Sequence, residues 1–173
     1  MSGSIPEVQF DAFGACTWVR FDSDEVESWA GIFGNGPGFS SAAAAVPSHD
    51  ERHCLVLARS RAYCVDVRAR SKVCSIDGLP FVSAIAIQRP ASWAVCTYTE
   101  LLALGSSGIS WRSERVALDG IIFESASATV VTGKVWQLEG WYNFRLDVSD
   151  MRFERREFVT RDWFEFADSR GPA

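Results

Sequence analysis

The chain has 173 residues and a mass of 19.1 kDa, enough for one domain that buries ~70% of its unfolded surface without disulfides or metals. Hydrophobic residues make up 47% and charged residues 23%, which excludes disordered and fibrous classes. The net charge of −5 argues against a general nucleic-acid binder, and no apolar run approaches the ~20 residues of a membrane span. The N-terminus has no basic start followed by an apolar core, so we expect no signal peptide and a cytoplasmic protein.

Helical patterns are scarce, and only residues 24–30 and 40–46 are candidates for short helices. Short β-branched and aromatic runs broken by Gly, Pro, Ser and Asp predict strands instead. The expected strands are Ala15–Phe21, Cys54–Arg59, Ala62–Arg68, Lys72–Ile76, Val82–Gln88, Trp93–Tyr98, Glu100–Leu104, Ile121–Ser125, Thr129–Leu138, Trp141–Val148 and Arg152–Thr160. Turn-sized gaps between them predict antiparallel hairpins, so the expected fold class is all-β.

Between the first two strands, residues 31–47 are rich in Gly and Ala and are expected to form a loop. The whole segment 21–49 is acidic and irregular, and irregular segments on a rigid scaffold often carry binding sites. Near the other end, residues 142–148 alternate apolar and polar side chains, as in a half-buried strand. The following run, Arg152–Thr160, is charged on both faces at its start, which is typical of a protected edge strand.

A short sequence pattern, the internal repeat, recurs about every 40 residues, a spacing typical of propeller blades. Val65-Asp66-Val67, Leu102-Ala103-Leu104 and Leu146-Asp147-Val148 each precede a turn and another strand. This divides much of the chain into units at about 50–79, 80–118 and 119–160.

The second unit contains the run from Leu101 to Arg112, LLALGSSGISWR. This run resembles the blade motif of quinoprotein-like and WD-type β-propellers, in which a Trp docks between blades. Gly105 replaces the usual Asp, and the spacings from Gly105 to Gly108 and from Gly108 to Trp111 are each one residue short. The resemblance implies four-stranded, blade-like sheets. Because three units are too few for an ordinary closed propeller, we expect a small propeller-like or sandwich-like single domain over residues 1–173.

The charge is concentrated near the N-terminus, since residues 1–50 hold seven acids and one base. Such asymmetry favours a partner with a basic surface, although a merely solvated face gives the same pattern. Five cysteines without a CxxC pair predict reduced, buried thiols. Cys54, Cys64 and Cys74 recur every ten residues, which could place them on neighbouring strands.

The sequence contains only weak motifs for phosphate binding, metal binding or nucleophilic catalysis. The glycine run at residues 34–38 has no following Lys for a phosphate loop. His49 and His53 have a zinc-like spacing, but the segment leads directly into a strand. Cys54 follows His53, yet adjacent strand residues point to opposite faces, which disfavours a nucleophilic pair.

Two groups of residues that are scattered along the sequence remain candidates for a functional site. A hydrolase would need a pair of carboxylates, and nothing selects one among Glu100, Glu114, Asp119 and Glu139. Near the C-terminus, bases and aromatics interleave as in single-strand binders, but neighbouring acids offset the charge. These residues are Arg145, Arg152, Phe153, Arg155, Arg156, Phe158, Trp163 and Phe164.

The aromatic content of 13%, with seven Trp, suggests that some rings are exposed as interface anchors. The best candidates are Trp29, Phe33, Trp141 and Trp163. Together with the acids, they predict a partner-binding site formed by Asp22, Asp24, Glu25, Glu27, Trp29 and Phe33.

The resulting hypothesis is a non-catalytic protein without cofactor or metal that binds one partner protein, and neither nucleic acid nor a membrane. In size and charge it resembles the class of bacterial immunity proteins, which neutralise a basic, nuclease-type toxin by occluding its active or substrate-binding site. The alternatives are a small-molecule or glycan sensor, a carboxylate-dependent hydrolase, and a homo-oligomer subunit that pairs through Arg152–Thr160.

Overall fold

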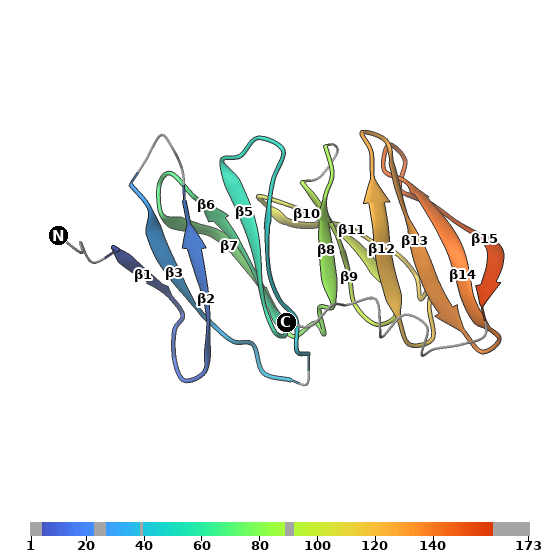
Figure 1. Ribbon diagram of the computed structural model, residues 1–173, viewed down its shortest axis with the longest axis horizontal. Helices are drawn as coiled ribbons and strands as arrows, with labels where there is room; N and C mark the ends of the chain where they lie inside the picture. The colour runs from blue at the N-terminus through green and yellow to red at the C-terminus, as the bar shows by residue number, and fades with distance from the viewer. Residues whose placement is uncertain (1–4, 23–26, 39, 89–91, 161–173) are drawn as a thin grey trace.

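The computed structural model describes residues 5–22, 27–38, 40–88 and 92–160, and these form β-strands without any helix. The fifteen strands make four small sheets that follow one another in chain order along the long axis (Figure 1). The all-β, antiparallel, blade-like fold class predicted from the sequence is confirmed, and one parallel pair, β1 with β3, is the exception. The described residues contain no helix long and apolar enough to cross a membrane.

The first sheet has three strands in the order β1-β3-β2. Its strands are β1 (Glu7–Phe10), β2 (Cys16–Phe21) and β3 (Trp29–Gly34). Gly34 allows the β1–β2 connection to approach β3 closely, because a Cβ at this position would lie 1.9 Å from the carbonyl oxygen of Asp11.

Each of the other three sheets is a four-stranded antiparallel meander. The second sheet holds β4 (Ala43–Pro47), β5 (His53–Ala58), β6 (Arg61–Asp66) and β7 (Ser71–Asp77). The third holds β8 (Ser83–Ala86), β9 (Trp93–Cys96), β10 (Leu101–Gly105) and β11 (Gly108–Arg112). The fourth holds β12 (Ile121–Ala126), β13 (Val130–Gln137), β14 (Gly140–Asp147) and β15 (Arg152–Thr160), with β15 at its edge as predicted.

Three apolar layers lie between the four sheets. Residues of β5 alternate between two of them: Cys54, Val56 and Ala58 face the first sheet, while Leu55 and Leu57 face the third. The inner sheets are therefore covered on both faces, and their two central strands read as nearly continuous apolar runs. The fourth sheet is covered on one face, and β13 alternates accordingly.

The internal repeat predicted from the sequence occupies the same position in three successive sheets. Asp66, Gly105 and Asp147 each end the third strand of their sheet, just before the hairpin turn to the fourth. Asp66 accepts the backbone N–H of Ala69 at 2.9 Å, and Asp147 accepts that of Ser149 at 3.1 Å. The carboxylate thus holds the turn in two of the sheets, whereas Gly105 at the same position of the third sheet has no side chain to do so.

Three expectations for residues 24–47 are wrong. The Ala-rich run forms β4 rather than a helix, because pairing with β5 satisfies its backbone and outweighs the helical preference of Ala. The expected helix at 24–30 and the expected loop at 31–47 both overlap β3, whose central position between β1 and β2 depends on tertiary pairing. Residues 23–26 lie outside the described part of the chain.

The turn carboxylate of Asp66 gives the fold an acid-sensitive contact. The N–H of Ala69 and the guanidinium of Arg52, with Nε 2.8 Å from Oδ2, lower the pKa of Asp66. Because the folded-state pKa lies below the unfolded value, ionised Asp66 stabilises the fold above about pH 4, and this stabilisation is lost as the pH falls through the folded-state pKa.

We therefore expect Asp66→Asn to lower the free energy of unfolding by about 1–2 kcal/mol at pH 7. The variant should lose less stability than the wild type between about pH 4 and pH 2. Urea titrations across this range measure both effects, and Asp119→Asn, on an exposed loop, is the control. Parallel pH profiles for wild type and Asp66→Asn would contradict the assignment.

Candidate protein-binding surface

The two aromatic anchors predicted from the sequence, Trp29 and Phe33, are both buried. Each has no exposed surface, and each contributes to the layer between the first and second sheets. Trp29 stacks on Phe21 with ring centroids 4.4 Å apart, and its indole N–H donates to the carbonyl of Val67 at 3.1 Å. The prediction that these rings are exposed is wrong, because the acidic segment leads into a central strand rather than a loop.

One of the other two rings predicted to be exposed is also buried. Trp141 is 2% exposed, and Trp163 lies outside the described residues.

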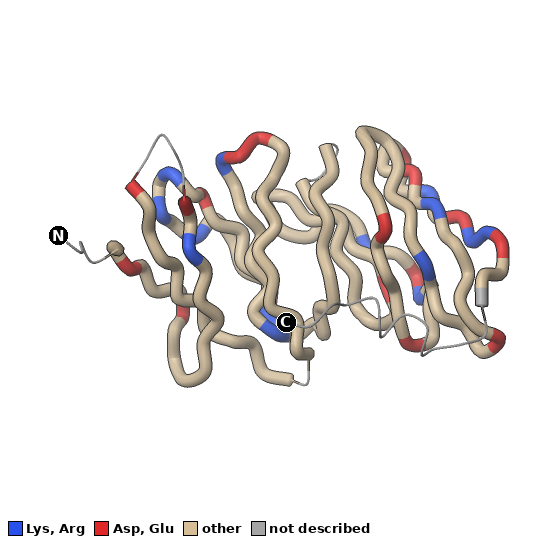
Figure 2. The backbone as a smooth tube through the Cα atoms, in the orientation of Figure 1, with Lys and Arg blue, Asp and Glu red and all other residues tan. Residues whose placement is uncertain are grey.

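The described acids near the β2–β3 connection are engaged by bases. Asp22 pairs with Arg20 at 2.8 Å, and Glu27 pairs with Arg70, from the β6–β7 turn, at 3.2 Å. Hydrogen bonds from Ser28 and Arg20 lower the pKa of Asp22, so this carboxylate stays ionised. Figure 2 shows acidic stretches of backbone at the ends of β2 and β3 that face their connection. Asp24 and Glu25 of the predicted site lie outside the described residues.

An exposed tryptophan missed by sequence reasoning lies on the outer face of the first sheet. Trp18 in β2 is 62% exposed, and it lies opposite Ile32 of β3 in the strand register. Phe10, Phe21, Trp29 and Phe33 occupy the inner face, so alternation places Trp18, Arg20, Ala30 and Ile32 on the outer face. The signal was available in the sequence, because Trp18 and Arg20 alternate with Val19 and Phe21.

Around Trp18 the outer face combines small apolar and charged groups. Glu7 and Gln9 of β1 are exposed and lie beside Ala30 and Ile32 in the register. The described chain places no further sheet on this side, because the first sheet lies at one end of the row (Figure 1). At the tip of the β1–β2 connection, Phe13 is 89% exposed. We call Glu7, Gln9, Trp18, Arg20 and Ala30 the Trp18 face; Ile32 lies on the same side of the sheet but is only 6% exposed.

The outer face of the fourth sheet, at the opposite end, differs in character. Ion pairs cover much of it: Lys134 with Glu124 at 2.6 Å, Arg145 with Asp147 at 3.2 Å, and Arg152 with Glu154 at 3.2 Å. Trp136 and Trp141 pair edge to face at one end of these strands. Terminal units of stacked folds need a polar outer surface, and the fourth sheet largely has one. The outer face of the first sheet also carries polar groups, Glu7, Gln9 and the Arg20–Asp22 ion pair, but Trp18 is exposed among them.

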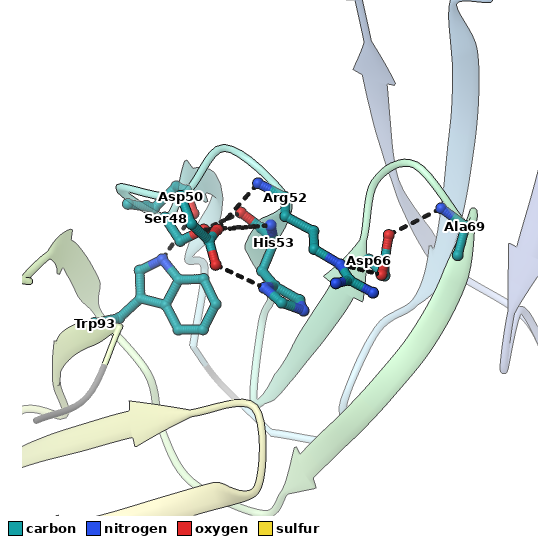
Figure 3. A network of polar contacts seen from close by, with 8 residues as sticks. Ser48, Asp50, Arg52, His53, Asp66, Ala69 and Trp93 are labelled. Carbon is teal, nitrogen blue, oxygen red and sulfur yellow. Dashed lines mark hydrogen bonds and ion pairs between the residues drawn. The ribbon is translucent and has the colours of Figure 1, made fainter. Parts of the chain in front are cut away.

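The histidine motif forms a structural network (Figure 3). Asp50 accepts hydrogen bonds from the hydroxyl of Ser48 and the N–H of Arg52, and its Oδ2 lies 3.2 Å from Nδ1 of His53. These contacts, with Ser48 first, lower the pKa of Asp50. Within the described residues no three His, Cys, Asp or Glu side chains gather as a metal site. The network therefore fixes the β4–β5 turn.

The cysteines are free thiols within sheets. Cys54, Cys64 and Cys74 lie on β5, β6 and β7, which confirms that they occupy neighbouring strands. Cys54, Cys64 and Cys96 are buried, and burial raises the pKa of each thiol to about 12. Cys16 and Cys74 are partly exposed. The three buried thiols therefore behave as small apolar side chains rather than nucleophiles.

Comparison with known proteins assigns no function to these surfaces. No protein-family model matches the chain, and no curated protein matches it.

Proposed function

We propose that the chain is a non-catalytic protein that binds one partner protein through the Trp18 face. The single observation that carries this proposal is Trp18, an indole 62% exposed on the outer face of a terminal sheet. Trp is among the residue types most enriched in binding hot spots, so an exposed indole on this face is a candidate anchor for a partner.

The chemistry of this face favours a partner with a basic surface. Glu7 is exposed on β1, and Asp22 and Glu27 flank the β2–β3 connection, where Asp24 and Glu25 follow in sequence. In such an interface, Trp18 forms the desolvated centre, because Ile32 is already buried in the free chain, and the acids accelerate association. Since Arg20 and Arg70 already pair with two of these acids, Trp18 supplies most of the affinity.

The specific form of the proposal is an inhibitor of the immunity-protein class, acting in the bacterial cytoplasm on a nuclease-type toxin. Its support is the acidic N-terminal part of the chain and the exposed anchor beside it. A basic nucleic-acid-binding cleft is complementary to such a surface, because carboxylates can take the place of phosphates. The partner is then inhibited by occlusion of its substrate-binding site.

The test begins with capture of a partner from the native cytoplasm at moderate salt, followed by affinity measurement with the purified partner. We expect Trp18→Ala to weaken binding by about 2 kcal/mol or more, roughly 30-fold. Leu138→Ala is the matched control, because Leu138 is 90% exposed on the β13–β14 turn of the fourth sheet.

The expected partner is basic and loses its nuclease activity at one-to-one stoichiometry. Asp22→Lys combined with Glu27→Lys should slow association without abolishing the complex. Equal affinity of Trp18→Ala and the wild type would overturn the assignment of the Trp18 face. An acidic partner, or one that stays fully active in the complex, would overturn the inhibitor proposal. It would not overturn the assignment of the Trp18 face as a binding surface.

A further inference from the structure

An open groove of about 730 Å³ lies between the outer strands of the third and fourth sheets. Its walls come from the end of β11, the segment 113–116 that follows it, the end of β13, and β15. Both β11 and β15 are edge strands, so the groove forms where two stacked sheets end. It is separate from the Trp18 face, which lies on the first sheet at the other end of the row (Figure 1).

Two aromatic side chains form what we call the floor of the groove, whose other lining residues are mostly polar. Trp111 and Phe153 line it, and both are partly buried against the apolar layer between the third and fourth sheets. Phe153 stacks on Phe144 with centroids 5.5 Å apart, which fixes its ring. A flat ligand ring placed on this floor would meet aromatic carbon rather than hydrogen-bonding groups.

The rim carries three arginines, each held by contacts of its own. Arg115 donates from Nε to the carbonyl of Ala117 at 3.0 Å and from Nη2 to that of Leu118 at 2.9 Å. The guanidinium of Arg155 lies 5.0 Å from the ring centre of Tyr142. Arg112 pairs with Glu100 at 2.6 Å.

These contacts leave the positive charges of Arg115 and Arg155 available to a ligand. Carbonyls and an aromatic ring orient a guanidinium without neutralising it, and among the described residues neither Arg115 nor Arg155 forms an ion pair with a carboxylate. Glu114 also lines the groove, so the three arginines outnumber the two acids, Glu100 and Glu114, that lie on or beside it. The groove is a positive site on a chain whose net charge is −5.

We propose that this groove binds an aromatic anion, with its flat ring on Trp111 and Phe153 and its phosphate or carboxylate on Arg115 and Arg155. Guanidinium groups pair bidentately with both kinds of oxyanion, so the shared chemistry is a planar ring bearing a phosphate or carboxylate. The volume lies in the range of sites for small organic ligands. This site does not depend on the proposed partner protein.

Isothermal titration of the whole chain with three probes tests the proposal. Adenosine 5′-monophosphate carries a phosphate, indole-3-acetate carries a carboxylate, and adenosine carries a ring without a charge. We expect at least one of the two anions to bind with Kd below about 1 mM, more tightly than adenosine and more weakly as salt is added. The anion that binds distinguishes a phosphate ligand from a carboxylate ligand.

Arg115→Gln and Arg155→Gln should each weaken that binding about tenfold. Arg59→Gln is the control, because Arg59 is exposed between β5 and β6, outside the groove. Thermal unfolding of every variant shows whether the fold is intact. No binding of either anion, or equal binding by the two groove variants and the control, would overturn the proposal.

Discussion

Replacing Trp29 by alanine is expected to lower the free energy of unfolding by about 3–5 kcal/mol, the range for large aromatic side chains removed from a core. Trp29 has no exposed surface, stacks on Phe21 at 4.4 Å and meets Phe10 edge to face at 6.3 Å. The substitution also leaves the carbonyl of Val67 without the indole donor. For a chain of this length the loss corresponds to a fall in melting temperature of about 10 °C.

Trp18→Ala is the matched control for that experiment, since it removes the same side chain from the exposed outer face of the same sheet. Its expected cost to stability is about 1 kcal/mol or less. Urea and thermal unfolding of both variants measure the difference. Equal destabilisation by the two substitutions would show that the inner and outer faces of the first sheet are wrongly assigned.

Gly133→Ala in β13 is expected to destabilise the fold by about 3 kcal/mol, although it adds only one methyl group. A Cβ at Gly133 would lie 2.0 Å from the carbonyl oxygen of Ile122 and 2.7 Å from the ring of Phe144. The first of these atoms belongs to the backbone of the paired strand, which cannot move without breaking the β12–β13 ladder. Denaturant unfolding measures the loss.

Gly105→Ala is the companion variant, because Gly105 also lies in a strand and a Cβ there meets no atom within 4 Å. Its φ is not in the left-handed region, so alanine is compatible with the backbone, and we expect a change between zero and a stabilisation of about 1 kcal/mol. A Gly133→Ala variant as stable as Gly105→Ala would contradict the close approach of β12 and β13.

The sequence predicts β5 to β10 and β12 to β15 because each of these patterns has one interpretation. Residues 142–148 alternate, and the structure buries Phe144, Leu146 and Val148 on one side. Arg152–Thr160 carries charges on both faces and forms an edge strand. Local sequence alone was enough in these cases, because neighbouring strands are joined by short hairpins.

The N-terminal part could not be predicted in the same way. β3 pairs in parallel with β1 and antiparallel with β2, and neither contact is encoded in the Gly-rich composition of its neighbourhood. Trp29 and Phe33 therefore appeared to be surface anchors, whereas pairing turns both rings inward. The groove was equally hidden, since β11 and β15 meet only in the folded chain.

The row of sheets also determines how local disturbances spread. Each apolar layer joins only two neighbouring sheets, so the molecule behaves as a short one-dimensional array in which every unit is stabilised by the units beside it. The end sheets each share one such layer and are the first to fray, while the inner pair holds the array together. The second sheet separates the Trp18 face from the groove between the third and fourth sheets. A change in the packing around one of them therefore has little effect on the free energy of the other.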